Sequence, residues 1–229
     1  MCGIIGFSSK NTTTKDIEIL RKVMIESRIR GKHASGIAWS DGSSIHSRVL
    51  PVPIDQLVQE FDLHSLIHGG QISLIAHARY STSDIKYNQP IIGDSLAIAH
   101  NGVITQDNPE NWEKSYGFKC KTHNDSELLL RVLEKGKQPD KVFPDSSIAA
   151  VILTDKGQIT AIRNGLRPLW QGKIGEGVVY ASTYDILLRS GVKDIKKLKP
   201  DHKSDELQRR DFEKWKSPIS RTPILTKSS

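Results

Sequence analysis

Residues 1–7 read MCGIIGF, which places one of only two cysteines directly behind the first methionine and in front of a short apolar run. Loss of methionine before a small residue would leave Cys2 with both a thiol and a free α-amine. A free thiol has a pKa of about 8.5 and an α-amine one of about 7.7 to 8.0, so this amine is able to accept a proton near neutral pH. We therefore expect Cys2 to combine nucleophile and base in one residue. The alternative is a small buried residue that starts a strand.

The bulk composition is that of a folded protein, with 229 residues of which 37% are hydrophobic and 26% charged. This length is sufficient to bury a core without disulfides or metals. No apolar stretch reaches the roughly 18 to 20 residues that cross a bilayer, and the first residues lack the basic start of a signal peptide. Cys2 and Cys120 are too few for a disulfide framework. We expect a cytoplasmic protein with reduced thiols and no membrane contact.

The net charge of +7 is concentrated at the carboxyl end. From Leu187 onward twelve Lys or Arg stand against six Asp or Glu, whereas residues 1–186 carry only +1. The runs KDIKKLKPDHK (193–203) and LQRRDFEKWK (207–216) are able to meet an acidic partner or a phosphate backbone. The alternative, which we favour, is a solvated, partly helical or frayed terminus. Binding of nucleic acid is therefore not expected.

The hydrophobic pattern predicts a mixture of strands and helices. Strands at 72–80 and 96–104 are too apolar for a sheet with one wet face, which indicates sheets covered on both sides. Further strand and hairpin patterns lie at 2–8, 34–50, 147–154, 158–164, 169–173 and 177–182. Helical spacing lies at 13–31, 54–67, 124–136 and 184–191. We expect residues 1–205 to form one unit of stacked sheets and flanking helices, and residues 206–229 to form a basic tail.

Polar residues stand at the ends of the predicted elements. The tripeptide His-Asn-Gly ending at Gly102 lies where we expect a strand to break, and it supplies an amide side chain beside a glycine N–H, as an oxyanion site requires. Asn-Gly is also a common hairpin turn. Arg79 ends the other apolar strand, where a guanidinium is able to grip a carboxylate or to form a rim salt bridge. Asp125, at a helix start, is able to hold an ammonium, and either it or Asn124 is able to cap the helix.

Together these groups describe a substrate. Arg79 suits an α-carboxylate and Asp125 an α-ammonium. Cys2 suits attack on a side-chain carbonyl, and Asn101 with Gly102 suits the oxyanion that forms there. An amino acid with a terminal amide satisfies all of them, so the pattern predicts glutamine or asparagine.

The chain resembles the class II glutamine amidotransferase domain, a family of N-terminal-nucleophile hydrolases that includes the glutaminase halves of glutamine phosphoribosylpyrophosphate amidotransferase and glucosamine-6-phosphate synthase. Six segments match the family's motifs in order over about 180 residues. They are MCGIIGF (1–7), RGKHASGI (30–37), HARYSTS (77–83), AHNGVI (99–104), THNDSELLL (122–130), and IRNGLRPLW (162–170) followed by VVYAST (178–183). The resemblance implies an α+β fold, a four-layer αββα sandwich of two mainly antiparallel sheets flanked by helices.

The resemblance also implies roles for individual residues. Cys2 is implied to be the catalytic nucleophile, with its α-amine as general base and acid. Asn101 and Gly102 are implied to form the oxyanion hole, and Arg79 and Asp125 to hold the carboxylate and ammonium of glutamine. Further residues implied to line the substrate pocket are Thr82, Arg30 and Gly31.

The expected reaction is hydrolysis of glutamine to glutamate and ammonia through a Cys2 thioester. Because the predicted tail is too short for a synthase domain, we expect the ammonia to reach a separate acceptor enzyme. Two alternatives stay open. One is a free-standing hydrolase that cleaves a γ-glutamyl amide in a small metabolite or peptide, and the other is a catalytically silent binding or regulatory module.

Three histidines, His77, His100 and His123, lie 23 residues apart on separate predicted elements. They lack the i, i+4 spacing and the cysteine pairs of metal sites, so we expect structural or loop roles for them. No glycine-rich loop has the lysine and serine ending of a phosphate-binding motif. We expect no metal, no nucleotide and no other cofactor.

Overall fold

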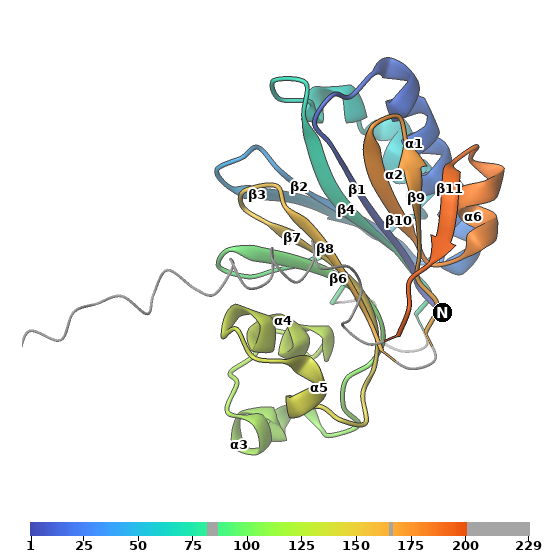
Figure 1. Ribbon diagram of the computed structural model, residues 1–229. Coiled ribbons are helices and arrows are strands. Elements are labelled where there is room, and N and C mark those ends of the chain that lie inside the picture. Colours follow the sequence, from blue (N-terminus) through green and yellow to red (C-terminus); the bar gives the residue numbers. More distant parts are fainter. Residues whose placement is uncertain (82–86, 165–166, 201–229) are drawn as a thin grey trace, which may run out of the picture.

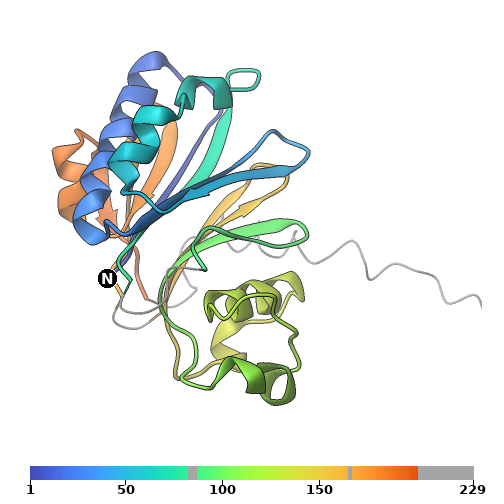
Figure 2. The same ribbon diagram turned by 180° about the vertical axis from the view of Figure 1, so that it is seen from behind.

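A computed structural model describes residues 1–81, 87–164 and 167–200 of the protein (Figure 1). Two antiparallel sheets lie face to face, and helices cover the outer face of each (Figures 1 and 2). This arrangement is the four-layer α+β sandwich that the resemblance implies.

The first sheet has seven strands in the order β11-β9-β10-β1-β4-β2-β3. Their bounds are β1 (Gly3–Ser9), β2 (Ala34–Ser40), β3 (Ile45–Leu50), β4 (Ile72–Arg79), β9 (Trp170–Ile174), β10 (Gly177–Ala181) and β11 (Lys193–Lys197). Strand β1 lies in the centre, and Gly3 stands opposite Ala78 of β4. The start of β1, at Cys2, therefore lies beside the end of β4, at Arg79.

The second sheet has four strands in the order β5-β6-β7-β8. Their bounds are β5 (Ile91–Ile92), β6 (Leu96–Val103), β7 (Ser147–Thr154) and β8 (Ile159–Arg163). Strand β6 does not break at the Asn-Gly pair, contrary to the sequence prediction, because Asn101 and Gly102 stay paired with Ala149 and Ile148 of β7. The pair is also not a hairpin turn. Glycine serves close packing here, since a Cβ on Gly102 would lie 1.7 Å from the Ser147 oxygen.

Helices form the two outer layers of the sandwich (Figure 1). On the first sheet pack α1 (Thr14–Glu26), α2 (Ile54–Glu60) and α6 (Tyr184–Arg189), and on the second pack α3 (Trp112–Tyr116), α4 (Ser126–Glu134) and α5 (Pro139–Val142). Short 3-10 turns are η1 (Ser27–Arg30), η2 (Leu63–Leu66) and η3 (Pro109–Asn111). One apolar cluster fills each helix-to-sheet interface and a third, which includes Ile4, Ile75 and Val151, fills the space between the sheets. Burial on both faces explains why the central strands are so apolar.

Helix α1 follows directly from its sequence. Thr13 Oγ1 accepts from the Asp16 backbone N–H at 3.2 Å, and the Asp16 carboxylate accepts from the Thr13 N–H at 2.9 Å. This reciprocal cap satisfies two otherwise unpaired donors. Four apolar side chains at helical spacing are fully buried against the sheet: Ile17, Leu20, Val23 and Met24.

Two helices are shorter than the sequence predicts. The first ends at Glu26 and tightens into η1 before Gly31, where Ser27 Oγ donates to the Val23 oxygen at 2.7 Å and competes with the helical ladder. The segment 54–67 is divided into α2 and η2, because Asp62 Oδ1 accepts from the His64 N–H at 2.9 Å and starts a new turn.

The basic run after α6 also differs from its prediction. Residues 193–197 form β11, an edge strand that pairs with β9, and are neither helical nor frayed. An edge strand tolerates lysines because their side chains reach solvent and discourage pairing with other chains. Leu198, 5% exposed, packs between the sheets. The predicted boundary at 205 and the basic tail 206–229 lie outside the described residues.

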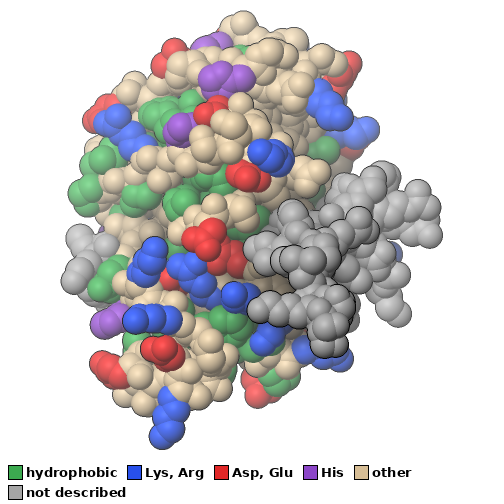
Figure 3. Space-filling model, turned by 90° about the vertical axis from the view of Figure 1, so that its left-hand side faces the viewer, with side chains coloured by type: hydrophobic (Ala, Val, Ile, Leu, Met, Phe, Trp, Pro, Cys, Tyr) green, Lys and Arg blue, Asp and Glu red, His purple; other side chains and the backbone are tan. Residues whose placement is uncertain are grey.

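The surface charge is mixed on one face of the molecule. On the face shown in Figure 3, Lys and Arg side chains alternate with Asp, Glu and apolar ones, and no single sign dominates. None of the helices in the described ranges is long and apolar enough to cross a membrane.

Candidate active site

A pocket of about 540 Å³ lies where the two sheets meet the start of α4. Residues from both sheets and from the helix line it. Those predicted from the sequence are Cys2, Arg79, Asn101, Gly102 and Asp125. The fold thus brings five predicted site residues, from four separate segments, around one cavity.

Cys2 and Asn101 make direct contact in this pocket. The Cys2 backbone nitrogen donates to Asn101 Oδ1 at 3.3 Å, and Cys2 Sγ lies 3.9 Å from the Tyr80 oxygen. Asn101 is 5% exposed, and its Nδ2 has no hydrogen-bond partner among the described residues. An unused buried donor is costly to a fold, so this N–H is typical of a group that binds a ligand.

The N–H of Gly102 points away from β7, as the strand register requires. Its opposite residue is Ile148, whose N–H donates to the side-chain Oδ1 of Asn164 and whose oxygen accepts from the Asn164 N–H at 2.8 Å, both on the far side of β7. Because bonding sides alternate along an antiparallel pair, Gly102 and Ile148 form a non-hydrogen-bonded pair. The Gly102 N–H therefore faces the same edge of β6 as the N–H of His100, toward the pocket.

Arg79 is held at the end of β4 by the loop that follows it. Its Nη1 donates to Asn88 Oδ1 at 2.7 Å and also to the Tyr87 oxygen. The guanidinium therefore lies in the pocket wall in a defined orientation.

Asp125 stands before α4 without capping it. Its Oδ2 accepts from the Ile104 N–H at 2.7 Å, just beyond β6. The cap comes from Asn124, whose Oδ1 accepts from the Ser126 N–H at 3.1 Å. Of the two capping residues that the sequence allowed, the structure uses Asn124, and the Asp125 carboxylate lines the pocket.

Arg30 and Gly31 are not among the residues that line this pocket, contrary to the prediction, but they contact Cys2 and Arg79, which do line it. Arg30 Nε donates to the Cys2 carbonyl oxygen at 3.4 Å, and burial lowers the pKa of its guanidinium below the ordinary value. A Cβ on Gly31 would lie 2.2 Å from the Arg79 carbonyl carbon, so only glycine lets η1 approach β4 this closely. Thr82, the remaining predicted site residue, lies outside the described residues.

Several known proteins are similar to this chain in sequence, over a large part of its length. Residues 77–189 match the family model of the glutamine amidotransferase domain. Amidophosphoribosyltransferase of Bacillus subtilis is 26% identical over 168 residues, which cover 67% of this chain and 35% of the relative. Glutamine–fructose-6-phosphate aminotransferase (isomerizing) of Photorhabdus laumondii is 28% identical over 188 residues, which cover 72% of this chain and 29% of the relative. These matches support a class II glutamine amidotransferase domain in this chain.

Solved structures show the same fold as this amidotransferase domain. Glutamine phosphoribosylpyrophosphate amidotransferase of B. subtilis, complexed with ADP and GMP, superposes with a TM-score of 0.66 at 23% identity and covers 87% of this chain and 46% of its own. A glutamine aminotransferase class-II domain protein from Silicibacter pomeroyi gives a TM-score of 0.51 at 13% identity and covers 92% of its own chain. The chain spans about a third of the length of the curated relatives named above.

The Cys2 pocket also contains residues that the sequence analysis did not select, among them Gln89 and Ser126. All three histidines that we expected to be structural line it as well. His77 is 1% exposed, and burial, followed by the nearby Arg79, lowers its pKa to about 3, so its imidazole is neutral at physiological pH. The alternation of strand side chains was a usable signal, because His77 lies two residues before Arg79 on the same face of β4.

The three histidines do not form a metal centre. Within the described ranges, no group of three or more His, Cys, Asp or Glu side chains is placed to hold a metal ion.

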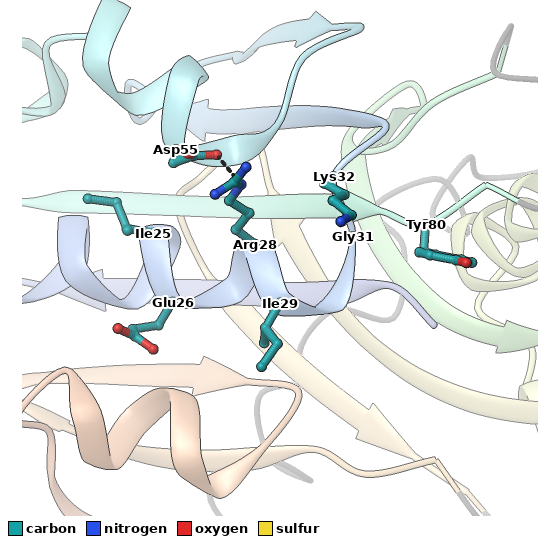
Figure 4. Close-up of a pocket in the computed structure, with 8 residues that line it drawn as sticks. All are labelled: Ile25, Glu26, Arg28, Ile29, Gly31, Lys32, Asp55 and Tyr80. Carbon is teal, nitrogen blue, oxygen red and sulfur yellow. Dashed lines mark ion pairs between the residues drawn. The ribbon is translucent and has the colours of Figure 1, made fainter.

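A second hollow, of about 460 Å³, lies on the outer surface beside η1 and α2 (Figure 4). Arg28 and Asp55 form an ion pair of 3.2 Å at its edge, and Ile29, 75% exposed, points away from that pair. Gly31 lines this hollow, whereas Tyr80 lines both this hollow and the Cys2 pocket. Tyr80 therefore separates the proposed site from the outer surface.

Proposed function

We propose that this chain hydrolyses the side-chain amide of glutamine through a thioester on Cys2 and releases glutamate and ammonia. The proposal is carried by the 3.3 Å contact between Cys2 N and Asn101 Oδ1 in a pocket that Arg79 and Asp125 also line. A thiol, an amide donor, a cation and an anion thus surround one cavity. The names of the relatives, which are enzymes of glutamine amide transfer, support the same substrate.

The first half of the proposed reaction forms the thioester. The Cys2 sulfur attacks the carboxamide carbon, and its proton passes to the free α-amine of the same residue. Negative charge develops on the carbonyl oxygen, where the Asn101 Nδ2–H and Gly102 N–H are proposed to donate. The carbon–nitrogen bond then breaks, and the nitrogen takes the proton from the amine and leaves as ammonia.

The second half releases glutamate. A water molecule gives a proton to the α-amine and attacks the thioester, and the thiol regains that proton as the carbon–sulfur bond breaks. Arg79 is proposed to hold the substrate carboxylate and Asp125 its ammonium throughout, which keeps the reacting carbon next to the sulfur. Arg30 and Gly31 are proposed to brace the pocket, and Thr82 to line it.

Replacement of the nucleophile tests the proposal. Cys2→Ala is expected to abolish glutamate release from glutamine, measured by a coupled assay, with an unchanged circular dichroism spectrum. The matched control is Cys120→Ala, because burial and the nearby Glu127 raise the pKa of the Cys120 thiol to about 11 and leave it a poor nucleophile. Robust turnover by Cys2→Ala would assign the chemistry to another residue.

The same assay separates the alternatives. Faster release of glutamate from γ-glutamyl methylamide or a γ-glutamyl dipeptide than from glutamine would favour the γ-glutamyl amide hydrolase. Tight binding of glutamine without turnover would favour the silent module. A separate acceptor chain for the ammonia and a cytoplasmic location stay predictions of the sequence analysis.

A further inference from the structure

Gln89 belongs to a closed triangle of hydrogen bonds in the wall of the Cys2 pocket. Its Oε1 accepts from the His100 N–H at 2.6 Å, and its Nε2 donates to Ser126 Oγ at 3.1 Å. The third side joins Ser126 Oγ to His100 Nδ1 at 2.8 Å. The three residues come from three separate segments and are 6%, 2% and 1% exposed in the order Gln89, His100, Ser126. Bulk water therefore does not compete for these bonds.

The hydrogen bonds of the triangle have one consistent direction. His100 Nε2 lies 3.3 Å from the Ser147 oxygen and must donate to it. In a neutral imidazole Nδ1 then accepts, so the Ser126 hydroxyl donates to His100 and itself accepts from Gln89. Burial lowers the pKa of His100, which favours this neutral form.

The triangle joins two parts of the proposed active site. His100 directly precedes Asn101 in β6, and Ser126 directly follows Asp125 at the start of α4. The strand with the proposed oxyanion donors is thus tied to the helix start with the proposed ammonium ligand. A second tie is the 2.7 Å hydrogen bond from the Ile104 N–H to Asp125 Oδ2.

The loop that carries Gln89 also reaches the first sheet. Asn88 Oδ1 accepts from Arg79 Nη1 at 2.7 Å, at the end of β4. The Gln89 backbone packs against β2, where a Cβ on Gly36 would lie 2.3 Å from the Gln89 oxygen. Gln89 is therefore held by the first sheet while its side chain holds the second sheet and α4.

We propose that Gln89 is a positioning residue that acts through His100 and Ser126 to set the spacing between the oxyanion donors of β6 and the ammonium ligand before α4. The inference rests on the proposed function, because the spacing concerns glutamine bound in that pocket. A residue needed only for folding would change stability alone. A positioning residue changes the chemistry that depends on the pocket and leaves the thiol itself as reactive as before.

The test compares two disruptive variants with two matched controls. Gln89→Met keeps the length of the side chain and removes both hydrogen-bonding ends, and Ser126→Ala removes the hydroxyl. The controls are Gln56→Met on the exposed face of α2 and Ser190→Ala. Ser190 is a buried serine directly after α6, and its Oγ donates to the Ile186 oxygen at 2.7 Å.

Each full-length chain is treated separately with two reagents, and modification of Cys2 is followed by mass spectrometry. A chloroketone analogue of glutamine reacts only after it binds in the pocket, whereas iodoacetamide needs only an accessible thiol. We expect the chloroketone rate constant to fall roughly 10- to 100-fold in Gln89→Met and in Ser126→Ala. In both disruptive variants the rate constant with iodoacetamide should equal that of the protein without substitutions. In the controls the rate constants with both reagents should equal those of that protein.

Two further measurements guard against simple misfolding. A variant that combines Gln89→Met with Ser126→Ala should react with the chloroketone no more slowly than the slower of the two single variants, because the two side chains act as one unit. Amide hydrogen exchange over residues 99–104 should become faster in both single variants and stay unchanged in the controls.

Unchanged chloroketone rates in Gln89→Met would overturn the inference and leave the proposed function intact. A parallel fall with both reagents would indicate general disruption and would overturn it too. If the protein without substitutions did not react with the chloroketone, this result would instead contradict the proposed function and the inference that rests on it.

Discussion

The backbone nitrogen of Cys2 donates to Oδ1 of Asn101 at 3.3 Å, a contact between residues 99 positions apart that joins the two sheets. The other end of the same amide, Nδ2, is buried and has no partner within the described part of the chain. Asn101 therefore couples the position of the proposed base to that of the proposed oxyanion donor.

Removal of this amide should slow catalysis more than it weakens binding. We expect Asn101→Ala to lower kcat for glutamine hydrolysis by roughly 10²- to 10³-fold, the usual cost of an oxyanion donor, with a smaller change in KM. Steady-state kinetics measure both constants. The control is Asn11→Ala, whose side chain bonds to Glu176 at the exposed surface. A loss confined to KM would contradict the oxyanion role.

The proposed chemistry requires a free α-amine on Cys2. A chain made with an uncleaved Gly-Ser extension before Met1 should bind glutamine but release no glutamate, because an amide nitrogen cannot accept the thiol proton. The same extension placed after Ser229 serves as the control. Intact mass spectrometry establishes the amino-terminal residue of each preparation, and equal turnover by the two extended chains would exclude the amine as base.

Gly31 should not tolerate a side chain. The Cβ of alanine would lie 2.2 Å from the Arg79 carbonyl carbon and 2.4 Å from the Tyr80 nitrogen, so backbone must move. We expect Gly31→Ala to lower the free energy of unfolding by about 1 to 3 kcal/mol, as overpacking usually does. Urea denaturation measures this change. Lys32→Ala, at the exposed neighbouring position, should change it by less than about 0.5 kcal/mol.

Gly31→Ala should also weaken glutamine binding, because the displaced backbone carries Arg79. Steady-state kinetics should then show a raised KM for glutamine. An unchanged KM in a destabilised variant would restrict Gly31 to a structural role.

Glu127 should stabilise the fold only where its carboxylate is ionised. Burial by itself would raise its pKa, but hydrogen bonds from the Lys121 and Thr122 backbone and from Arg131 outweigh burial and hold the pKa below its ordinary value. The unfolded chain therefore binds this proton more tightly than the folded protein does. The stabilisation is complete above the unfolded pKa of about 4.3 and disappears as the pH falls through the lower folded value.

Glu127→Gln should accordingly lower the free energy of unfolding at pH 7 by about 2 kcal/mol, and the difference from the unmodified protein should shrink in acid. Urea denaturation at neutral and acidic pH measures the difference. The matched control is Glu113→Gln on the exposed side of α3. A difference independent of pH would show that lost packing, and not lost charge, is responsible.

Local patterns in the sequence predicted most of the secondary structure and five of the residues around the pocket. The capping pair Thr13 and Asp16 and the apolar stripe of α1 are local features, because side chains three and four positions apart share one helix face. The strand predicted at 96–104 is confirmed by β6, but the break expected at Asn101 and Gly102 was wrong, since an Asn-Gly pair suits a turn equally well until β7 is known to lie opposite. The lysine-rich β11 was missed because its strand conformation comes from pairing with β9.

The position of Cys2 before the first strand, the face of β4 that carries Arg79 and the start of α4 directly after Asp125 could be predicted from the sequence alone, since backbone geometry sets the direction of each side chain within its own element. The hydrogen-bonded triangle of Gln89, His100 and Ser126 could not be predicted from the sequence alone. Its members meet only when two sheets stack and a helix docks on one of them. That meeting depends on how whole buried faces fit together, which no short stretch of residues specifies.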